Sequence, residues 1–488
     1  MLYNLVICPH RVAKDAFADR ALRDPVNPFV QLLWERGNLY EKKLIAGLEL
    51  GFVDLGGARE SERARLTLEA MLRGDPLIYG GRIEAEDLVG EPDLLRREGP
   101  GYAPIDIKSG AGGEDGEGDA KPKLHYAVQL ALYVDVLEKL GLSAGRKAYI
   151  WDVHGKEVPY YLRKAYGRPP RRLWDRYTDS LAQARAIVAQ SAQTLPALCA
   201  ACKQCHWRSA CMGALWAADD LTLIPELGRD KRDTLAPQIP TVKALAAVDP
   251  SAYVVKRKTV FAGIGVDSLV KFHRRAQLLS ARAAQPYLKR AVELPEAAKE
   301  IFFDIEVDPL RDFVYLHGFI ERIDGSERSE DYHAYFADTV DAAHEESAFR
   351  DAWDYLRRNT MAAVYYYSSY ECTIWKKLAT KYPSVCSAAE VEAMFAESRF
   401  VDLYAMVKSK TEWPTYDHSI KTLGKFLGFK WRDSEPSGAA SIAWFDKWVK
   451  TGDMTTKWRI MEYNEDDCRA MRVLLQGIRK LQVKSFSP

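Results

Sequence analysis

The segment IFFDIEVDPL, which starts at Ile301, places two carboxylates inside an otherwise apolar strand. Its side chains alternate between the two sides of the strand, so Asp304 and Glu306 point the same way. Two carboxylates at this spacing repel each other strongly unless a cation lies between them, and they can hold a pair of metal ions. The pattern favours a metal site built on a sheet. The plainer alternative is an edge strand with solvated acids.

Two later segments add acidic residues to the same half of the chain. The run VYYYSSYECTIWKKL is typical of a strand that leads into a helix, with Glu371 near the junction. The run EYNEDDCRAMRVLL is helical in pattern, and on it Tyr463 and Asp467 are four residues apart and share a face. These residues are further candidates for the same site.

The length of 488 residues exceeds what one hydrophobic core supports, so two large domains and a connector are expected. We place the domains at residues 1–217 and 297–488 and the connector at residues 218–296. The predicted fold class is α/β and multidomain, with a helical connector.

The first domain carries its own carboxylates. The run YAPIDIKSG alternates as a strand, which places Asp106 and Lys108 on one face, and Asp93 precedes it by one short connection. Two carboxylates can hold Mg²⁺ or Mn²⁺, hard ions that prefer oxygen ligands. A lysine two residues on can orient the attacking water and offset charge on the phosphorane. A D-x-K triplet alone also arises by chance on exposed strands.

Two predicted helices complete this arrangement. The helix over residues 29–46 carries Glu41, a third candidate ligand. The helix over residues 124–140 carries Gln129 and Tyr133, which are four apart and share a face.

In this order the residues resemble the RecB-like branch of the PD-(D/E)xK nucleases. The resemblance implies a restriction-endonuclease-like domain whose three carboxylates hold Mg²⁺ or Mn²⁺, and whose lysine, glutamine and tyrosine are catalytic. The matching residues are Glu41, Asp93, Asp106, Lys108, Gln129 and Tyr133. Relatives often have a histidine just before the helical glutamate, where this chain has Tyr40.

The second acidic set resembles the DEDDy 3′→5′ exonucleases of the ribonuclease H-like fold. Asp304 and Glu306 match the first motif, and Tyr463-x-x-x-Asp467 matches the third. The run SIKTLGKFLGFKWR resembles the helical segment that precedes the third motif in such enzymes. The second motif has Glu371 where most relatives have aspartate. The resemblance implies that all four carboxylates ligate Mg²⁺ or Mn²⁺ and that the tyrosine positions the attacking water.

The cysteines are clustered. Cys202-x-x-Cys205 has the spacing of two ligands to one metal centre, Cys211 follows, and Cys199 is a spare or alternative ligand. Iron–sulfur nucleases of the RecB-like branch use one cysteine before the nuclease core and three after it, and Cys8 fits that place. The resemblance therefore implies a [4Fe–4S] cluster on Cys8, Cys202, Cys205 and Cys211. Zinc in a four-cysteine site is the alternative.

Two glycine-turn units in the connector resemble helix-hairpin-helix motifs. Such motifs grip a phosphate through backbone N–H groups at a helix N-terminus. The better copy is FAGIGVDSLVKFHRRAQL, and a linker that merely spaces the domains is the alternative. The nucleic-acid ligands expected there are Gly263, Gly265, Lys271, Arg274 and Arg275.

Together the resemblances imply a metal-dependent nuclease acting on DNA, single-stranded or at ends, with a C-terminal centre that works 3′→5′. Net charge is +1, so bulk charge does not indicate this partner. No export signal or membrane span is evident, which predicts a cytoplasmic protein. The chain has no G-x-x-x-x-G-K-[ST] loop, so a helicase would be a separate partner. The alternatives are a nucleic-acid end-binding module with one or both centres inactive, and an RNase.

Overall fold

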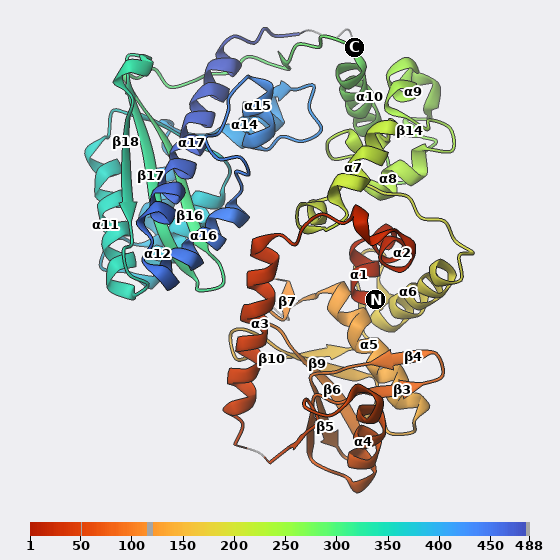
Figure 1. Ribbon diagram of the computed structural model, residues 1–488. Helices are drawn as coiled ribbons and strands as arrows, with labels where there is room; N and C mark the ends of the chain where they lie inside the picture. The colour runs from red at the N-terminus through yellow and green to blue at the C-terminus, as the bar shows by residue number, and fades with distance from the viewer. Residues whose placement is uncertain (50, 115–120, 485–488) are drawn as a thin grey trace. The chain divides into compact units, whose positions relative to one another are not determined.

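The computed structural model describes residues 1–49, 51–114 and 121–484, which fall into two compact units (Figure 1). The expected connector lies within the second unit. The first unit comprises Met1–Val26, Val30–Pro196 and Ala201–Ala210, and the second comprises Asn27–Phe29, Ala197–Ala200 and Cys211–Pro488.

The first unit is built on a six-stranded mixed sheet. Its strands β5 and β6 are antiparallel, with Leu94 opposite Ile105, and β6 runs parallel to β9. In sheet order the strands are β1 (Val53–Asp54), β2 (Leu77–Tyr79), β5 (Leu94–Glu98), β6 (Gly101–Ile107), β9 (Lys147–Trp151) and β10 (Glu157–Tyr161). Short antiparallel pairs join β3 (Ile83–Ala85) to β4 (Leu88–Gly90), β7 (Gly113–Glu114) to β8 (Lys121–Pro122), and β11 (Ala165–Tyr166) to β12 (Arg171–Arg172).

Helices cover both faces of this sheet because its strands are apolar on both sides. Ile105 and Ile107 pack in one cluster with Ile45 of α3, whereas Leu95 packs in another with Val134 of α5. Helix α5 is apolar around much of its circumference because the sheet and α6 both contact it. The helices are α1 (Leu2–Ile7), α2 (Pro9–Phe17), α3 (Pro28–Ala46), α4 (Glu60–Arg73), α5 (Leu124–Lys139) and α6 (Leu173–Val188).

The second unit contains a five-stranded sheet in which β16 pairs antiparallel with β17 and parallel with β19. The ladder shifts register just after Glu306, which marks a β-bulge of the kind often found beside functional sites. In sheet order the strands are β18 (Asp331–Phe336), β17 (Phe313–Ile323), β16 (Lys299–Asp308), β19 (Ala363–Tyr366) and β20 (Phe400–Asp402).

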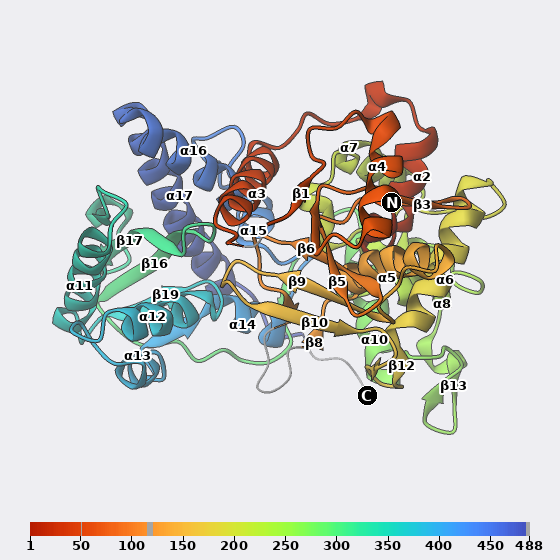
Figure 2. The ribbon, with the colours of Figure 1, turned by 90° about the horizontal axis from the view of Figure 1, so that it is seen from below.

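This sheet also lies between two helical layers (Figure 2). Phe303 packs with Trp375 of α12 on one face, and Phe302 packs with Met471 of α17 on the other. The first layer contains α11 (Ala342–Arg358), α12 (Tyr370–Lys381) and α13 (Ala388–Phe395). The second contains α14 (Leu403–Lys410), α15 (Ile420–Phe426) and α17 (Met454–Arg479), and α16 (Gly438–Thr451) packs against α17.

The connector has a small apolar core of its own, which includes Leu235, Leu245 and Phe272. Its helices are α8 (Gly228–Leu235), α9 (Val242–Ala247) and α10 (Val266–Ser280), with a hairpin of β13 (Val254–Val255) and β14 (Lys258–Thr259) before α10. A short ladder of β15 (Tyr287–Leu288) with β21 (Thr411–Glu412) joins the segment after α10 to the rest of the unit.

The predicted elements that carry the candidate residues are confirmed: α3, α5 and β6 in the first unit, and β16, the β19–α12 junction and α17 in the second. Within the described ranges, no helix combines the length and the apolar composition needed to span a bilayer.

Candidate metal centres

Three carboxylates converge in the second unit. Asp304 and Glu306 lie on β16 and Asp467 lies on α17, and one oxygen of each is within 4.8 Å of the others. Oxygen donors this close together suit a hard divalent cation. Among the residues that the structure describes, no other group of three or more His, Cys, Asp or Glu meets this criterion.

An asparagine and a glycine hold α17 against β16. Nδ2 of Asn464 donates to Oδ2 of Asp304 at 2.9 Å, and Oδ1 of Asn464 accepts from the Tyr332 hydroxyl at 2.9 Å. Gly318 lies opposite Asp304 in the β16–β17 ladder, where a Cβ would stand 1.6 Å from Oδ1 of Asn464. Only glycine therefore permits this approach, which brings Asp467 to the strand.

A lysine contacts both functional residues of α17. Nζ of Lys421 lies 2.8 Å from the Tyr463 hydroxyl and 3.0 Å from Oδ2 of Asp467. The indole N–H of Trp431 donates to Oδ1 of Asp467 at 2.7 Å. Lys421 is in the first turn of α15, whose N-terminus is capped by the Ser419 hydroxyl. The ammonium therefore contacts the hydroxyl and the carboxylate together.

Glu371 approaches the same centre from the first turn of α12, although it lies outside the group of three. Its side chain is buried, and burial raises its pKa to about 8 with a contribution from the charge of Asp402. Its own charge raises the pKa of Asp304. Oε2 of Glu371 is buried without a hydrogen-bond partner, a costly state that a cation would relieve.

Burial and mutual repulsion dominate the electrostatics of this centre. Burial raises the pKa of Asp304 well above its usual range, and the charges of Glu306 and Asp467 add to the effect. Burial, with the charge of Asp467, raises the pKa of Glu306 to about 8, although Lys421 opposes this. A divalent cation would offset the repulsion, so these residues fit Mg²⁺ or Mn²⁺.

We expect the affinity of this centre for Mn²⁺ to rise with pH. The pKa of Glu306 is raised to about 8 and the pKa of Asp304 is also raised, so protons compete with the metal at neutral pH and leave as the pH rises through the pKa of Glu306. Calorimetric titration of an Asp106→Asn background, which weakens the other centre, should show about tenfold tighter binding at about pH 8 than at about pH 6.5. Glu306→Gln should abolish this binding at both pH values, because it removes a ligand. An affinity independent of pH would contradict the electrostatic account.

Asp93, Asp106 and Lys108 also lie together, in the first unit. Nζ of Lys108 is 2.9 Å from Oδ2 of Asp106, and Oδ2 of Asp93 accepts from the Ile107 N–H at 2.6 Å. Burial and the charge of Asp106 raise the pKa of Asp93 to about 8, while Lys108 opposes this. The site therefore contains buried Asp106 and half-buried Asp93 beside one ammonium.

The remaining candidates of the first unit surround these three residues. The Tyr79 hydroxyl donates to Oε1 of Glu41 at 2.9 Å, and the charge of Glu41 contributes to the raised pKa of Asp93. Nε2 of Gln129 donates to the Tyr133 hydroxyl at 2.8 Å. Burial raises the pKa of Tyr133 well above its usual range, with contributions from Asp106 and Asp93. Glu41 and Tyr133 thus lie within electrostatic range of Asp93, and Gln129 contacts Tyr133. The roles of these residues stay predictions.

Tyr40, which stands where relatives often have histidine, makes a hydrogen bond to the backbone. Its hydroxyl donates to the backbone carbonyl of Asp152, in the turn between β9 and β10. The side chain therefore anchors α3 to the sheet.

Two of the expected cysteine ligands, Cys8 and Cys205, interact although they lie far apart in the sequence. Burial raises the pKa of Cys205, and the charge of Cys8 contributes. The surrounding segments are joined by Asp15, whose Oδ1 accepts from the Trp207 indole at 2.9 Å and from the His206 ring at 2.7 Å. Helix α2 and residues 206–207 of the first unit are thus held together.

The remaining cysteines differ in burial and in the unit to which they belong. Cys202 is half-buried in the first unit, whereas Cys199 is exposed and, with Cys211, belongs to the second. Cys211 lies on α7 (Arg208–Ala217). The four-cysteine ligand set stays a prediction.

The connector residues are in contrasting environments. Gly263 has a φ of +75° and Gly265 is the N-cap of α10, as a glycine turn before a helix requires. Lys271 pairs with Glu226 at 2.8 Å. Arg275 is 2% exposed, and its guanidinium donates to buried Glu412. The sequence had instead suggested Arg275 as a surface ligand for phosphate. Protein carboxylates already occupy that guanidinium. Arg274 lines a hollow described below.

Several residues of the centres were missed from the sequence. Lys421 and Trp431 fall in the run SIKTLGKFLGFKWR, but no periodicity says which of its cations meets Asp467. Asn464 sits three residues before Asp467 on α17, a spacing that could have indicated a shared face. Tyr79 gave no signal.

Comparison with protein-family models identifies both halves of the chain. Residues 9–212 match the PD-(D/E)XK nuclease superfamily, and residues 301–478 match the RNase_H superfamily. The search of curated proteins gives no match. The chain thus joins a PD-(D/E)XK nuclease superfamily domain to a C-terminal domain of the RNase_H superfamily, as the sequence predicted.

Proposed function

We propose that the protein is a metal-dependent nuclease that hydrolyses phosphodiester bonds of DNA, single-stranded or at ends, at two centres. The C-terminal centre removes nucleotides from 3′ ends. The observation that carries this is the convergence of Asp304, Glu306 and Asp467 beside the Tyr463 hydroxyl. Membership of two nuclease-type superfamilies supports it. The division into residues 1–217, 218–296 and 297–488 belongs to the same proposal.

In the C-terminal centre Asp304, Glu306, Asp467 and Glu371 would hold Mg²⁺ or Mn²⁺. The metal, when bound, activates water and stabilises charge on the phosphate. The Tyr463 hydroxyl orients the attacking water, because it lies one helical turn from Asp467 and shares Lys421 with it. Asn464 keeps Asp304 in place, since its amide donates to that carboxylate.

In the N-terminal centre Glu41, Asp93 and Asp106 would hold the metal. Lys108 orients the water and offsets negative charge on the phosphate, because its ammonium is already held beside Asp106. Gln129 and Tyr133, joined by a hydrogen bond, position the scissile strand against Asp93 and Asp106.

Asp304→Asn should abolish trimming of 3′ ends, and Tyr463→Phe should slow it by about 10²-fold with little change in strand affinity, because the hydroxyl acts on the water. The assay follows a strand labelled at its 5′ end with Mn²⁺ in a Lys108→Ala background. Tyr335→Phe, on β18, is the matched control and should trim at the wild-type rate. If the Tyr463→Phe protein trims 3′ ends as fast as this control, Tyr463 does not position the attacking water.

Lys108→Ala should lower cleavage by the N-terminal centre about 10²-fold, because the ammonium that stabilises transition-state charge is removed. We would measure this with the C-terminal centre silenced by Asp304→Asn, on single- and double-stranded DNA and on RNA. Lys147→Ala is the control, since Lys147 lies on β9 of the same sheet and pairs with Glu98. Equal rates for the two variants would contradict the assignment.

We also propose a [4Fe–4S] cluster on Cys8, Cys202, Cys205 and Cys211. The influence of Cys8 on the pKa of Cys205 supports it. Anaerobically purified protein should be brown and contain iron and acid-labile sulfide, and Cys202→Ser should lose both. Cys372→Ser, in the second unit, should retain them. Stoichiometric zinc without iron would overturn the cluster in favour of a four-cysteine zinc site.

A further inference from the structure

A hollow of about 1120 Å³ lies in the second unit between α10 of the connector and the C-terminal end of α17. Three cations line it, namely Arg274, Lys480 and Lys484. Its described lining residues include no aspartate or glutamate, although acidic and basic residues are almost equal in number along the chain. A concave wall of one sign of charge concentrates positive potential and attracts an anion.

The same hollow presents one exposed aromatic ring. Phe426 is 40% exposed at the end of α15, whereas Tyr287 on β15 is buried and has Nζ of Lys484 at 5.2 Å from its ring centre. Cations that track a backbone together with rings on which bases can stack are what single-stranded nucleic acid requires of a binding groove. A small anion such as free phosphate would use the cations but not the ring of Phe426.

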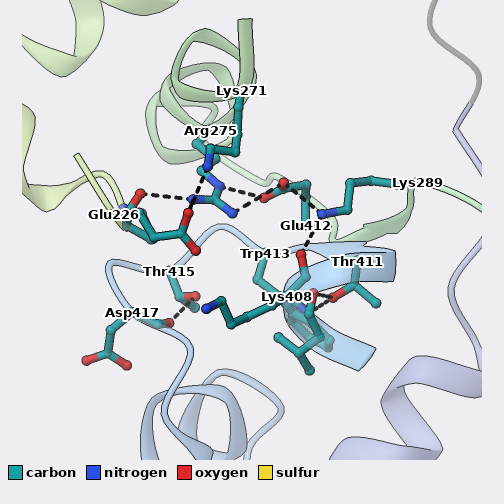
Figure 3. Close-up of polar contacts among 12 residues, drawn as sticks. Glu226, Lys271, Arg275, Lys289, Lys408, Thr411, Glu412, Trp413, Thr415 and Asp417 are labelled. Atoms are coloured by element: carbon teal, nitrogen blue, oxygen red, sulfur yellow. Dashed lines mark hydrogen bonds and ion pairs between the residues drawn. The ribbon is translucent and has the colours of Figure 1, made fainter. Parts of the chain in front are cut away.

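Helix α10, which contributes Arg274 to the hollow, is held by a buried ion pair (Figure 3). Nε of Arg275 donates to Oε2 of Glu412 at 2.8 Å, and the Pro225 carbonyl accepts from the same guanidinium at 2.9 Å. In the short ladder Glu412 lies opposite Tyr287. Breaking a buried pair of this kind is strongly destabilising, so α10 is fixed against the C-terminal domain. Adjacent arginines thus differ in role: Arg275 anchors the helix, and Arg274 faces the hollow.

Two helices connect the hollow to the C-terminal centre. The short helix α15 carries Lys421 in its first turn and Phe426 at its end. On α17, thirteen residues separate Asp467 from Lys480, the helix C-cap, which at the α-helical rise is about 20 Å. An extended strand of several nucleotides covers that distance.

We propose that this hollow binds the backbone of single-stranded nucleic acid several nucleotides 5′ of the end that enters the C-terminal centre. The direction of the strand rests on the proposed function, whereas binding in the hollow does not. The site differs from the helix-hairpin-helix contact expected at Gly263 and Gly265, because Lys480, Lys484 and Phe426 lie outside that motif.

The test is fluorescence anisotropy of the full chain with labelled oligothymidylate and oligouridylate, in EDTA so that no cleavage occurs. Arg274→Gln/Lys480→Gln should bind about tenfold more weakly. The slope of log affinity against log salt should fall by about 1.4, or roughly 0.7 for each phosphate that the variant no longer neutralises. The control is Arg350→Gln/Lys447→Gln, which removes two exposed cations outside the hollow and should bind as wild type does. Arg274→Lys/Lys480→Arg, which keeps both charges, should restore affinity.

A glutamine variant that binds like the control, with an unchanged salt slope, would overturn the proposal. So would equal inhibition of oligothymidylate binding by inorganic phosphate and by unlabelled strand. In Mn²⁺, the glutamine variant should raise KM for a long strand but not for a dinucleotide, which is too short to reach the hollow. If wild type binds strands through these cations yet never cleaves them, the hollow stands and the proposed exonuclease activity fails.

Discussion

Burial of carboxylates and repulsion among them govern the C-terminal centre. Asp304, Glu306 and Asp467 are brought within ligand distance of one another, and Glu371 adds its charge from α12. Folding tolerates this because burial favours protonated acids in the absence of a cation, and because Lys421 reaches Asp467. The same arrangement favours binding of a divalent cation, because a metal would displace the protons and would offset the carboxylate charge that Lys421 now offsets in part.

The surrounding fold serves that arrangement. The alternation of β16 directs two acids to one face, and the absence of a side chain at Gly318 lets Asn464 and α17 come close. The first unit meets a similar requirement differently: Lys108 follows Asp106 by two residues, so the compensating ammonium belongs to the same stretch of chain as the acid. In the connector a buried carboxylate is likewise compensated by a cation: the Arg275–Glu412 pair joins the connector to the C-terminal domain (Figure 3).

Much of the acidic framework was predictable because it follows from local periodicity. A period of two places Asp304 beside Glu306, and a spacing of four places Tyr463 beside Asp467. The two superfamilies followed from the order of such elements. Contacts between distant segments left no such trace: Lys421 meets Asp467 across 46 residues, and Arg275 meets Glu412 across 137. An arginine in a basic run looks like a surface ligand until its burial is known.

The most direct measurement of the central claim is the anomalous scattering of Mn²⁺ in crystals of the protein. The account predicts a Mn²⁺ peak coordinated by Asp304, Glu306 and Asp467, with Nζ of Lys421 displaced from Asp467. The peak should vanish in Glu306→Gln crystals soaked in the same way. Saturating Mn²⁺ with no peak at these carboxylates, and Lys421 still bound to Asp467, would contradict it.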